Sequence, residues 1–250
     1  MSTAAISDPD CDLDRFDSAT ADGQASKKAR IDVKRFDEIQ INDFTLKDKG
    51  KGKNGHMAFP LIGGEMIRFN LTPSDWAQTP FGLDVDSKFE KPSFLGGKEP
   101  EKKGAPEGLN LRLNLQPEQA AFLKQLDAVA EEAFGKLADN KWNPLVSTNP
   151  LFQKSVCKVV VVLKGEGLTK LTIVQDGKIH RGEGWDFIEP FVKSCNSFKF
   201  ADVKIGIRVK KLWNVAGKAG LGLEATQIVL RATEKPTEVD LFDDDEELLA

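Results

Sequence analysis

The segment Leu109-Asn-Leu-Arg-Leu-Asn-Leu115 alternates apolar and polar residues without a break. Successive side chains of a β-strand point to opposite faces of a sheet, so this alternation predicts a strand with one buried and one solvated face. A helix does not fit the pattern, because its apolar residues would recur every three or four positions. The chain must therefore build a sheet around this segment.

Several other apolar or alternating runs predict further strands. They lie near residues 39–46, 57–62, 66–71, 156–163, 168–174, 198–215 and 221–230. The turn Gly165-Glu-Gly167 favours pairing between the runs 156–163 and 168–174. Within 198–215 the apolar phase shifts after Val209, which predicts a β-bulge.

One helix is predicted, from Pro117 to about Ala138. Proline is favoured in the first helical turn because its missing N–H would have no partner there. Apolar residues then recur every three to four positions from Ala121 to Leu137, which gives one packing face. A mainly β chain with one intervening helix favours an elaborated OB-fold barrel over a β-sandwich. We expect this domain to span residues 31–233.

Charge divides the chain into three parts. Residues 1–26 carry −5, residues 239–250 carry −6, and the body between them carries +7. Residues 1–30 are rich in Asp, Ser and Ala and poor in large apolar side chains, and the acids of 234–250 repel one another, so both ends are expected to be disordered. A basic body between acidic ends indicates a protein that binds a polyanion.

The sequence contains no recognisable catalytic, metal-binding or cofactor-binding pattern. His56 and His180 fit no ligand motif, and phosphate-binding loops and nucleophile elbows are missing. Glu131 and Glu132 fall on the solvent face of the predicted helix. Three cysteines without CxxC spacing predict reduced thiols in an intracellular protein. We recognise no secretory signal and no membrane-spanning run, and expect a non-enzymatic protein without a cofactor.

Two basic features suit single-stranded nucleic acid, whose binders combine a cationic groove with stacking aromatic rings. A lysine–glycine segment is interpreted as a flexible basic loop. A second group of cations alternates with apolar residues on the strand 198–215, so period 2 places them on one face. The alternative for both is an ordinary solvated surface. The candidate residues are Lys47, Lys49, Lys51 and Lys53 in the loop, and Lys204, Arg208, Lys210 and the stacking residue Trp213 on the strand.

The last twelve residues combine six acids with apolar side chains. The acids could occupy the protein's own basic groove and compete with nucleic acid, while the apolar residues could dock on a partner protein. The alternative is a tail that only improves solubility. The candidate contacts are Phe242, Asp243, Asp244, Asp245, Glu246 and Glu247.

Three features near the C-terminus carry a family resemblance. They are Phe198-Lys-Phe-Ala-Asp-Val-Lys-Ile-Gly-Ile-Arg-Val-Lys-Lys-Leu-Trp213, Gly220-Leu-Gly-Leu-Glu-Ala-Thr-Gln-Ile-Val-Leu230 and the acidic tail. With these, the last hundred residues resemble the phage-type single-stranded DNA-binding proteins and their relatives in large DNA viruses of eukaryotes. The resemblance implies an OB fold, sequence-independent binding of single-stranded DNA, no catalytic residues, and a tail that recruits replication proteins. This tail ends in Leu-Leu-Ala, whereas the family tail usually ends on an aromatic residue.

We therefore expect a single-stranded DNA-binding protein of replication, recombination or repair. If viral, it would act in the nucleus or cytoplasm of a host cell. The choice between DNA and RNA stays open because pocket geometry decides it, and so does homo-oligomer formation. One alternative is a non-enzymatic structural or virion assembly protein, and another is an enzyme with a dispersed active site.

Overall fold

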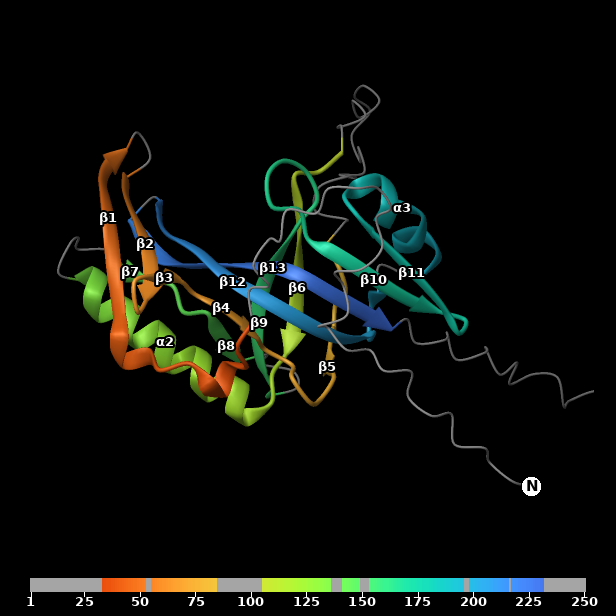
Figure 1. Cartoon of the computed structure of the whole chain (residues 1–250), viewed down its shortest axis with the longest axis horizontal. Helices are drawn as coiled ribbons and strands as arrows, with labels where there is room; N and C mark the ends of the chain where they lie inside the picture. The colour runs from red at the N-terminus through yellow and green to blue at the C-terminus, as the bar shows by residue number, and fades with distance from the viewer. Residues whose placement is uncertain are drawn as a thin grey trace, which may run out of the picture. The chain divides into compact units, whose positions relative to one another are not determined.

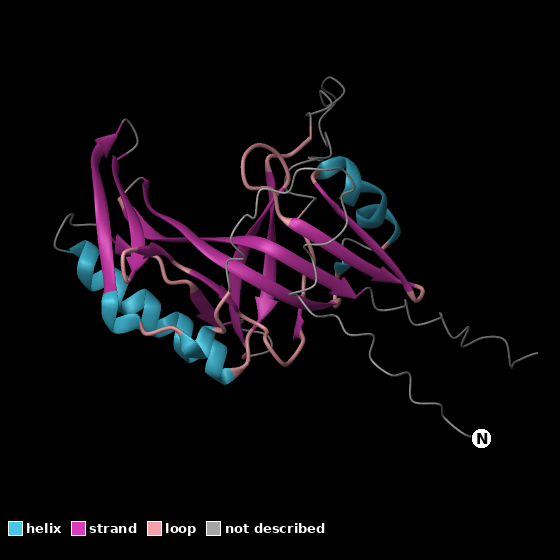
Figure 2. Cartoon of the chain, in the orientation of Figure 1, coloured by secondary structure: helices cyan, strands magenta, loops and turns pink. Residues whose placement is uncertain are grey.

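The computed structural model describes residues 33–52, 55–84, 105–135, 141–148, 153–195, 198–215 and 217–231. Strands predominate in this part of the chain (Figure 2), so the mainly β fold class is confirmed. The two ends predicted to be disordered, 1–30 and 234–250, lie outside the described residues, and the domain boundaries at 31 and 233 stay predictions.

A long antiparallel hairpin of β12 and β13 organises the sheet (Figure 1). Its two strands are Asp202–Val215 and Lys218–Arg231. The outer edge of β12 pairs with three strands, β2 (Gly55–Ile62), β4 (Arg68–Asn70) and β5 (Ala77–Gln78). The outer edge of β13 pairs in turn with β7 (Lys141–Trp142), β9 (Ser155–Val162) and β10 (Lys170–Gln175).

The remaining strands extend this framework. β1 (Phe44–Gly52) and β3 (Glu65–Met66) pair with β2, β8 (Val146–Thr148) pairs with β9, and β11 (Lys178–Glu183) pairs with β10. β6 (Gly108–Asn114) pairs with both β9 and β5. The pairings β12–β5–β6–β9–β13 thus return to β12 and form a ring of five strands. The link between β5 and β6 is one residue pair, Gln78 with Asn114, so an OB-fold barrel stays a prediction.

The interior of the ring is apolar because the alternation predicted for β6 holds. Leu109, Leu111 and Leu113 are fully buried, whereas Arg112 between them is exposed. The same in–out alternation runs along β12, where Ile205 and Ile207 face the core. Near-complete burial of leucine and isoleucine side chains gives each about 1.5–3 kcal/mol of favourable transfer free energy.

The predicted helix is confirmed as α2 (Pro117–Gly135). Its buried face includes Phe122, whose ring packs 5.6 Å from that of Phe36 and 5.1 Å from that of Phe69. Glu131 and Glu132 are exposed, as the helical period predicts. No helix in the described ranges is both long and apolar enough to cross a membrane.

The prediction of a single helix is wrong, since α3 spans Trp185–Ser194. Pro190 lies within this helix, and the buried Ile188 and Val192 anchor it. α3 packs on β11, while α2 packs near β1 at the other end of the strand order (Figure 1). The helix lies close to β11, because a methyl group at Gly182 would come within 2.3 Å of the Phe187 ring.

Three local predictions need correction. The lysine–glycine segment is not a loop, because β1 continues to Gly52 and pairs with β2 from Gly55. Residues expected to begin a strand near 39 form two short 3₁₀ turns, η2 (Phe36–Glu38) and η3 (Ile41–Asp43). The predicted pairing of 156–163 with 168–174 is also wrong, since both runs pair in parallel with β13 instead. The β-bulge is confirmed by a register shift between Val209 and Lys211.

Candidate nucleic-acid interface

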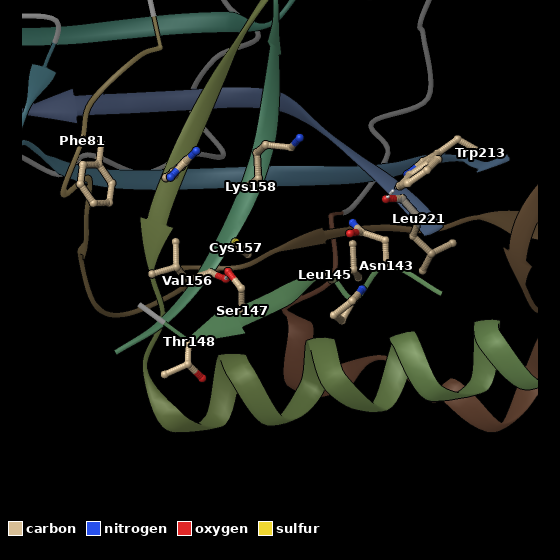
Figure 3. A pocket seen from close by; sticks show the side chains of 12 residues that line it. Phe81, Asn143, Leu145, Ser147, Thr148, Val156, Cys157, Lys158, Trp213 and Leu221 are labelled. Atoms are coloured by element: carbon tan, nitrogen blue, oxygen red, sulfur yellow. Dashed lines mark hydrogen bonds between the residues drawn. The ribbon is translucent and has the colours of Figure 1, made fainter. Parts of the chain in front are cut away.

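A groove of about 570 Å³ lies where β9 and β13 diverge. β13 pairs with β7 at 218–219 and with β9 at 224–225, and Leu221 between these contacts lines the groove. The segment from Asn143 to Thr148 contributes one wall, and outward-facing residues of β6 and β9 form another (Figure 3).

Two cations face each other across this second wall. Arg112 of β6 and Lys158 of β9 are directly opposite in the antiparallel register, and both side chains are exposed. Like charges in such positions destabilise a strand pair. Within the described ranges, no carboxylate forms an ion pair with either of them. The pair is therefore a positively charged site whose repulsion a bound anion would relieve.

Aromatic rings mark the two ends of the groove. Phe81 and Trp213 lie at opposite ends of the lining residues, with Lys158 between them (Figure 3). The Arg112 guanidinium lies 5.5 Å from the centroid of the Phe81 ring, a cation–π distance. Phe81 is 42% exposed, so part of its side chain is accessible to a ligand.

The orientation of Trp213 is fixed by its neighbours. Its indole Nε1–H donates to the carbonyl of Leu221 at 3.1 Å. Gly220 passes so close that a methyl group there would lie 2.8 Å from the Asn143 carbonyl and 2.9 Å from the indole ring. A larger residue at position 220 would have to displace either the ring or the wall.

A buried carboxylate on α2 holds the wall in place. Asp127 accepts hydrogen bonds from the indole N–H of Trp142 and the backbone N–H of Leu145, both at 2.9 Å. Burial raises the pKa of Asp127 above its ordinary value, and these two hydrogen bonds oppose that effect. The helix thus positions the segment that contains Asn143 and Leu145.

The structure brings together two of the predicted cations, but around an acid. Glu224 is 7% exposed and forms ion pairs with Arg208 at 2.7 Å and with Lys210 at 2.6 Å. The predicted alternation on β12 is confirmed, since Arg208 lies outward between buried neighbours. Much of the positive charge of this pair is nevertheless offset within the protein.

The other predicted residues are spread over the molecule. The Lys204 ammonium lies 5.1 Å from the centroid of the Trp76 ring, which also meets Arg231 at 4.3 Å. Lys47 is exposed on β1. Lys49 and Lys51 belong to the same strand by their backbone, and Lys53 lies outside the described residues. The tail contacts Phe242, Asp243, Asp244, Asp245, Glu246 and Glu247 also lie outside them.

Sequence reasoning missed Arg112, Lys158 and Phe81. The alternation of residues 109–115 already placed Arg112 on the solvated face, so that signal was available. The position of Lys158 opposite it depends on the pairing of strands 46 residues apart, which no local pattern encodes.

Residues suited to catalysis are dispersed. Within the described ranges, no group of three or more His, Cys, Asp or Glu side chains could hold a metal ion. The ring of His180 packs against Phe191 with 5.0 Å between centroids. Burial raises the pKa of the Cys157 thiol to about 12, which keeps it protonated and unreactive at neutral pH.

Comparison with known proteins gives matches among solved structures only. No protein-family model matches the chain, and no curated protein matches its sequence. The single-stranded DNA-binding protein of bacteriophage Enc34 in complex with ssDNA is 12% identical, with a TM-score of 0.38 over 77% of this chain and 98% of that one. The gp2.5 single-stranded DNA-binding protein of bacteriophage T7 is 14% identical, with a TM-score of 0.32 over 73% and 96%. TM-scores below 0.5 do not establish a shared fold, and the family resemblance stays a prediction.

Proposed function

We propose that this chain binds single-stranded nucleic acid, with single-stranded DNA as the expected ligand, along the groove between Phe81 and Trp213. The observation that carries the proposal is the facing pair Arg112 and Lys158. Two exposed cations in register, without a carboxylate partner in the described ranges, are suited to the phosphates of a polyanion.

The groove supplies the two kinds of contact that single-strand binders use. Arg112 and Lys158 neutralise backbone phosphates, and the rings of Phe81 and Trp213 offer stacking surfaces for bases. Stacking on a protein ring requires an unpaired base, so a duplex of the same length should bind more weakly. Because every base has a stacking face, we expect little sequence preference.

The wider role in the proposal is replication, recombination or repair, without catalysis. The acidic tail, with Phe242 and its neighbouring acids, would compete for the groove and recruit replication proteins. Support for this part is the charge division of the chain, since the acidic ends carry charge opposite to the groove. An OB-fold barrel belongs to the same proposal, supported by the ring of five strands with α2 packed beside it.

The test is fluorescence anisotropy with labelled oligo-dT at two salt concentrations, with an equal-length duplex as competitor. Arg112→Ala with Lys158→Ala should weaken binding about 10- to 100-fold, because two charge-assisted contacts are lost. The slope of log affinity against log salt should fall by about 1.4, since each phosphate contact on a single strand contributes about 0.7.

The matched control replaces two exposed lysines outside the groove lining, Lys34→Ala with Lys178→Ala. It removes the same net charge and should change the affinity about 3-fold or less. Equal losses in the two double variants would show that net charge alone drives binding and would overturn this site. No binding by the full chain or by a chain lacking the tail would overturn the function itself and favour an assembly protein.

A further inference from the structure

A strained turn before β12 presents the most exposed large apolar side chain in the described part of the chain. Phe200 is 63% exposed, and its φ angle is 61°. Phe198, two residues earlier, has a φ of 58° but is almost fully buried. Positive φ is costly for bulky residues and persists only where the surroundings impose it. Burial explains the conformation of Phe198, whereas the Phe200 ring gains little from packing.

Thr79 is the residue that imposes this turn. Its side chain is fully buried, and its hydroxyl donates to the carbonyl of Phe198 at 2.6 Å. The carbonyl of Thr79 accepts the backbone N–H of Phe200 at 2.7 Å, and its own N–H donates to Ala201 at 3.0 Å. These bonds fix the backbone of Phe200 and leave its ring in solvent.

The turn adjoins one end of the groove. Phe81 lies two residues after Thr79, so these hydrogen bonds join the segment that carries Phe81 to the turn that carries Phe200. A second cavity, of about 280 Å³, is lined by Lys199 of the turn together with Phe81 and Arg112 of the groove. Among the residues that line this second cavity, Asp84 is the acid and Lys199 and Arg112 are the cations.

We propose that Phe200 and Lys199 form an additional subsite for single-stranded nucleic acid, beyond Phe81. Phe200 would stack on a base, and Lys199 would contact the adjoining phosphate. This inference rests on the proposed function and lengthens the path of the strand, from Trp213 past Arg112 to the turn. Charge complementarity selects nucleic acid as the occupant, because two cations, Lys199 and Arg112, line the cavity between the turn and Phe81.

The experiment measures the affinity of oligo-dT ligands from about 6 to about 20 nucleotides, which bracket the site size of a single OB-type module. Phe200→Ala should weaken binding of the longest ligand about 5- to 20-fold. Phe200→Ala should not change the affinity for the shortest oligonucleotide that binds, because the groove alone holds that ligand. Lys199→Ala should reduce the salt slope for the longest ligand by about 0.7.

Phe200→Gly separates binding from folding. Glycine adopts a positive φ without strain, so this variant should melt at the same temperature as wild type or higher, yet lose the same affinity as Phe200→Ala. Ile179→Ala is the control, since Ile179 is also exposed but lies on β11 outside the cavities described here. It should bind like wild type at every length.

Three outcomes would overturn the subsite. Wild-type affinity of Phe200→Gly at every length would show that the ring takes no part, and would leave the proposed function intact. A loss of affinity that is the same for the shortest and longest ligands would place the effect in the groove. Failure of wild type to bind any ligand would overturn the proposed function, and the subsite with it.

Discussion

Two pairs of outward cations in the described part of the chain, Arg208 with Lys210 on β12 and Arg112 with Lys158 on β6 and β9, differ in what surrounds them. Arg208 and Lys210 converge on Glu224, which is nearly buried. Arg112 and Lys158 face each other without a carboxylate in the described ranges. The first pair stabilises the central hairpin, and the second is suited to an external anion. The number of cations on a strand therefore does not indicate a binding site. Whether those cations already have carboxylate partners does.

Glu224→Gln should have the largest effect, on stability. Removing one member of a buried ion pair costs about 3–5 kcal/mol. Lys210 is 47% exposed, so water can hydrate part of the charge left behind, and we expect about 3 kcal/mol. Chemical denaturation measures the loss, with the exposed Glu166→Gln as control. The Arg112 and Lys158 double variant should keep wild-type stability; if it unfolds as readily as Glu224→Gln, the two pairs do not differ as described.

Trp213→Ala should have the next largest effect, on binding. Loss of a stacking ring costs about 1–3 kcal/mol per base, and we expect about 2 kcal/mol in oligo-dT affinity. Trp213→Phe keeps a ring but removes the N–H that Leu221 accepts, so it should retain most of the affinity. Anisotropy titrations compare the two variants. If both lose equally, the indole acts through its hydrogen bond and not by stacking.

Asp127→Asn should have the smallest effect, on the groove wall. An amide oxygen can replace only one of the two accepting oxygens that hold Trp142 and Leu145, which costs about 1 kcal/mol. Burial raises the pKa of Asp127 above 3.8, so the folded state binds this proton more tightly than the unfolded chain. The contribution of Asp127 to stability is then full below the unfolded pKa and falls as pH rises through the folded pKa.

The variant should lack that decline, because asparagine does not titrate. Thermal unfolding from acidic to neutral pH, compared with wild type, measures the difference in slope. If the stability of the two proteins depends on pH in the same way, the pH dependence does not come from Asp127.

Local patterns predicted the elements that carry their own periodicity. The alternation of β6, the apolar face of α2 and the phase shift at Val209 are properties of neighbouring residues, and the structure has all three. α3 was missed because it is short and contains Pro190, and its anchors Ile188 and Val192 are buried only through packing with other parts of the chain. The partners of β9 and β10 were missed because pairing with β13 depends on contacts between distant parts of the chain.

The site was predicted only in part, because local patterns identify single residues but not the strand pairings that bring distant residues together. Trp213 was identified from its place after the basic strand, and it does line the groove. The ion pairs of Glu224 could have been anticipated, since β13 runs antiparallel along β12 and brings Glu224 opposite Arg208. The Arg112 and Lys158 pair could not, because it requires the register of two strands that a helix separates.

The order of the strands has a consequence for synthesis on the ribosome. β13 is the last strand of the described part, and it pairs with β12, β7, β9 and β10. Until residue 231 has emerged, these four earlier strands have an uncovered edge, and such edges invite pairing with other chains. Between the emergence of β7 and that of residue 231, the nascent polypeptide is thus in a form prone to self-association. Slow translation or a holdase chaperone would matter more for this protein than for one whose strands pair in order of appearance.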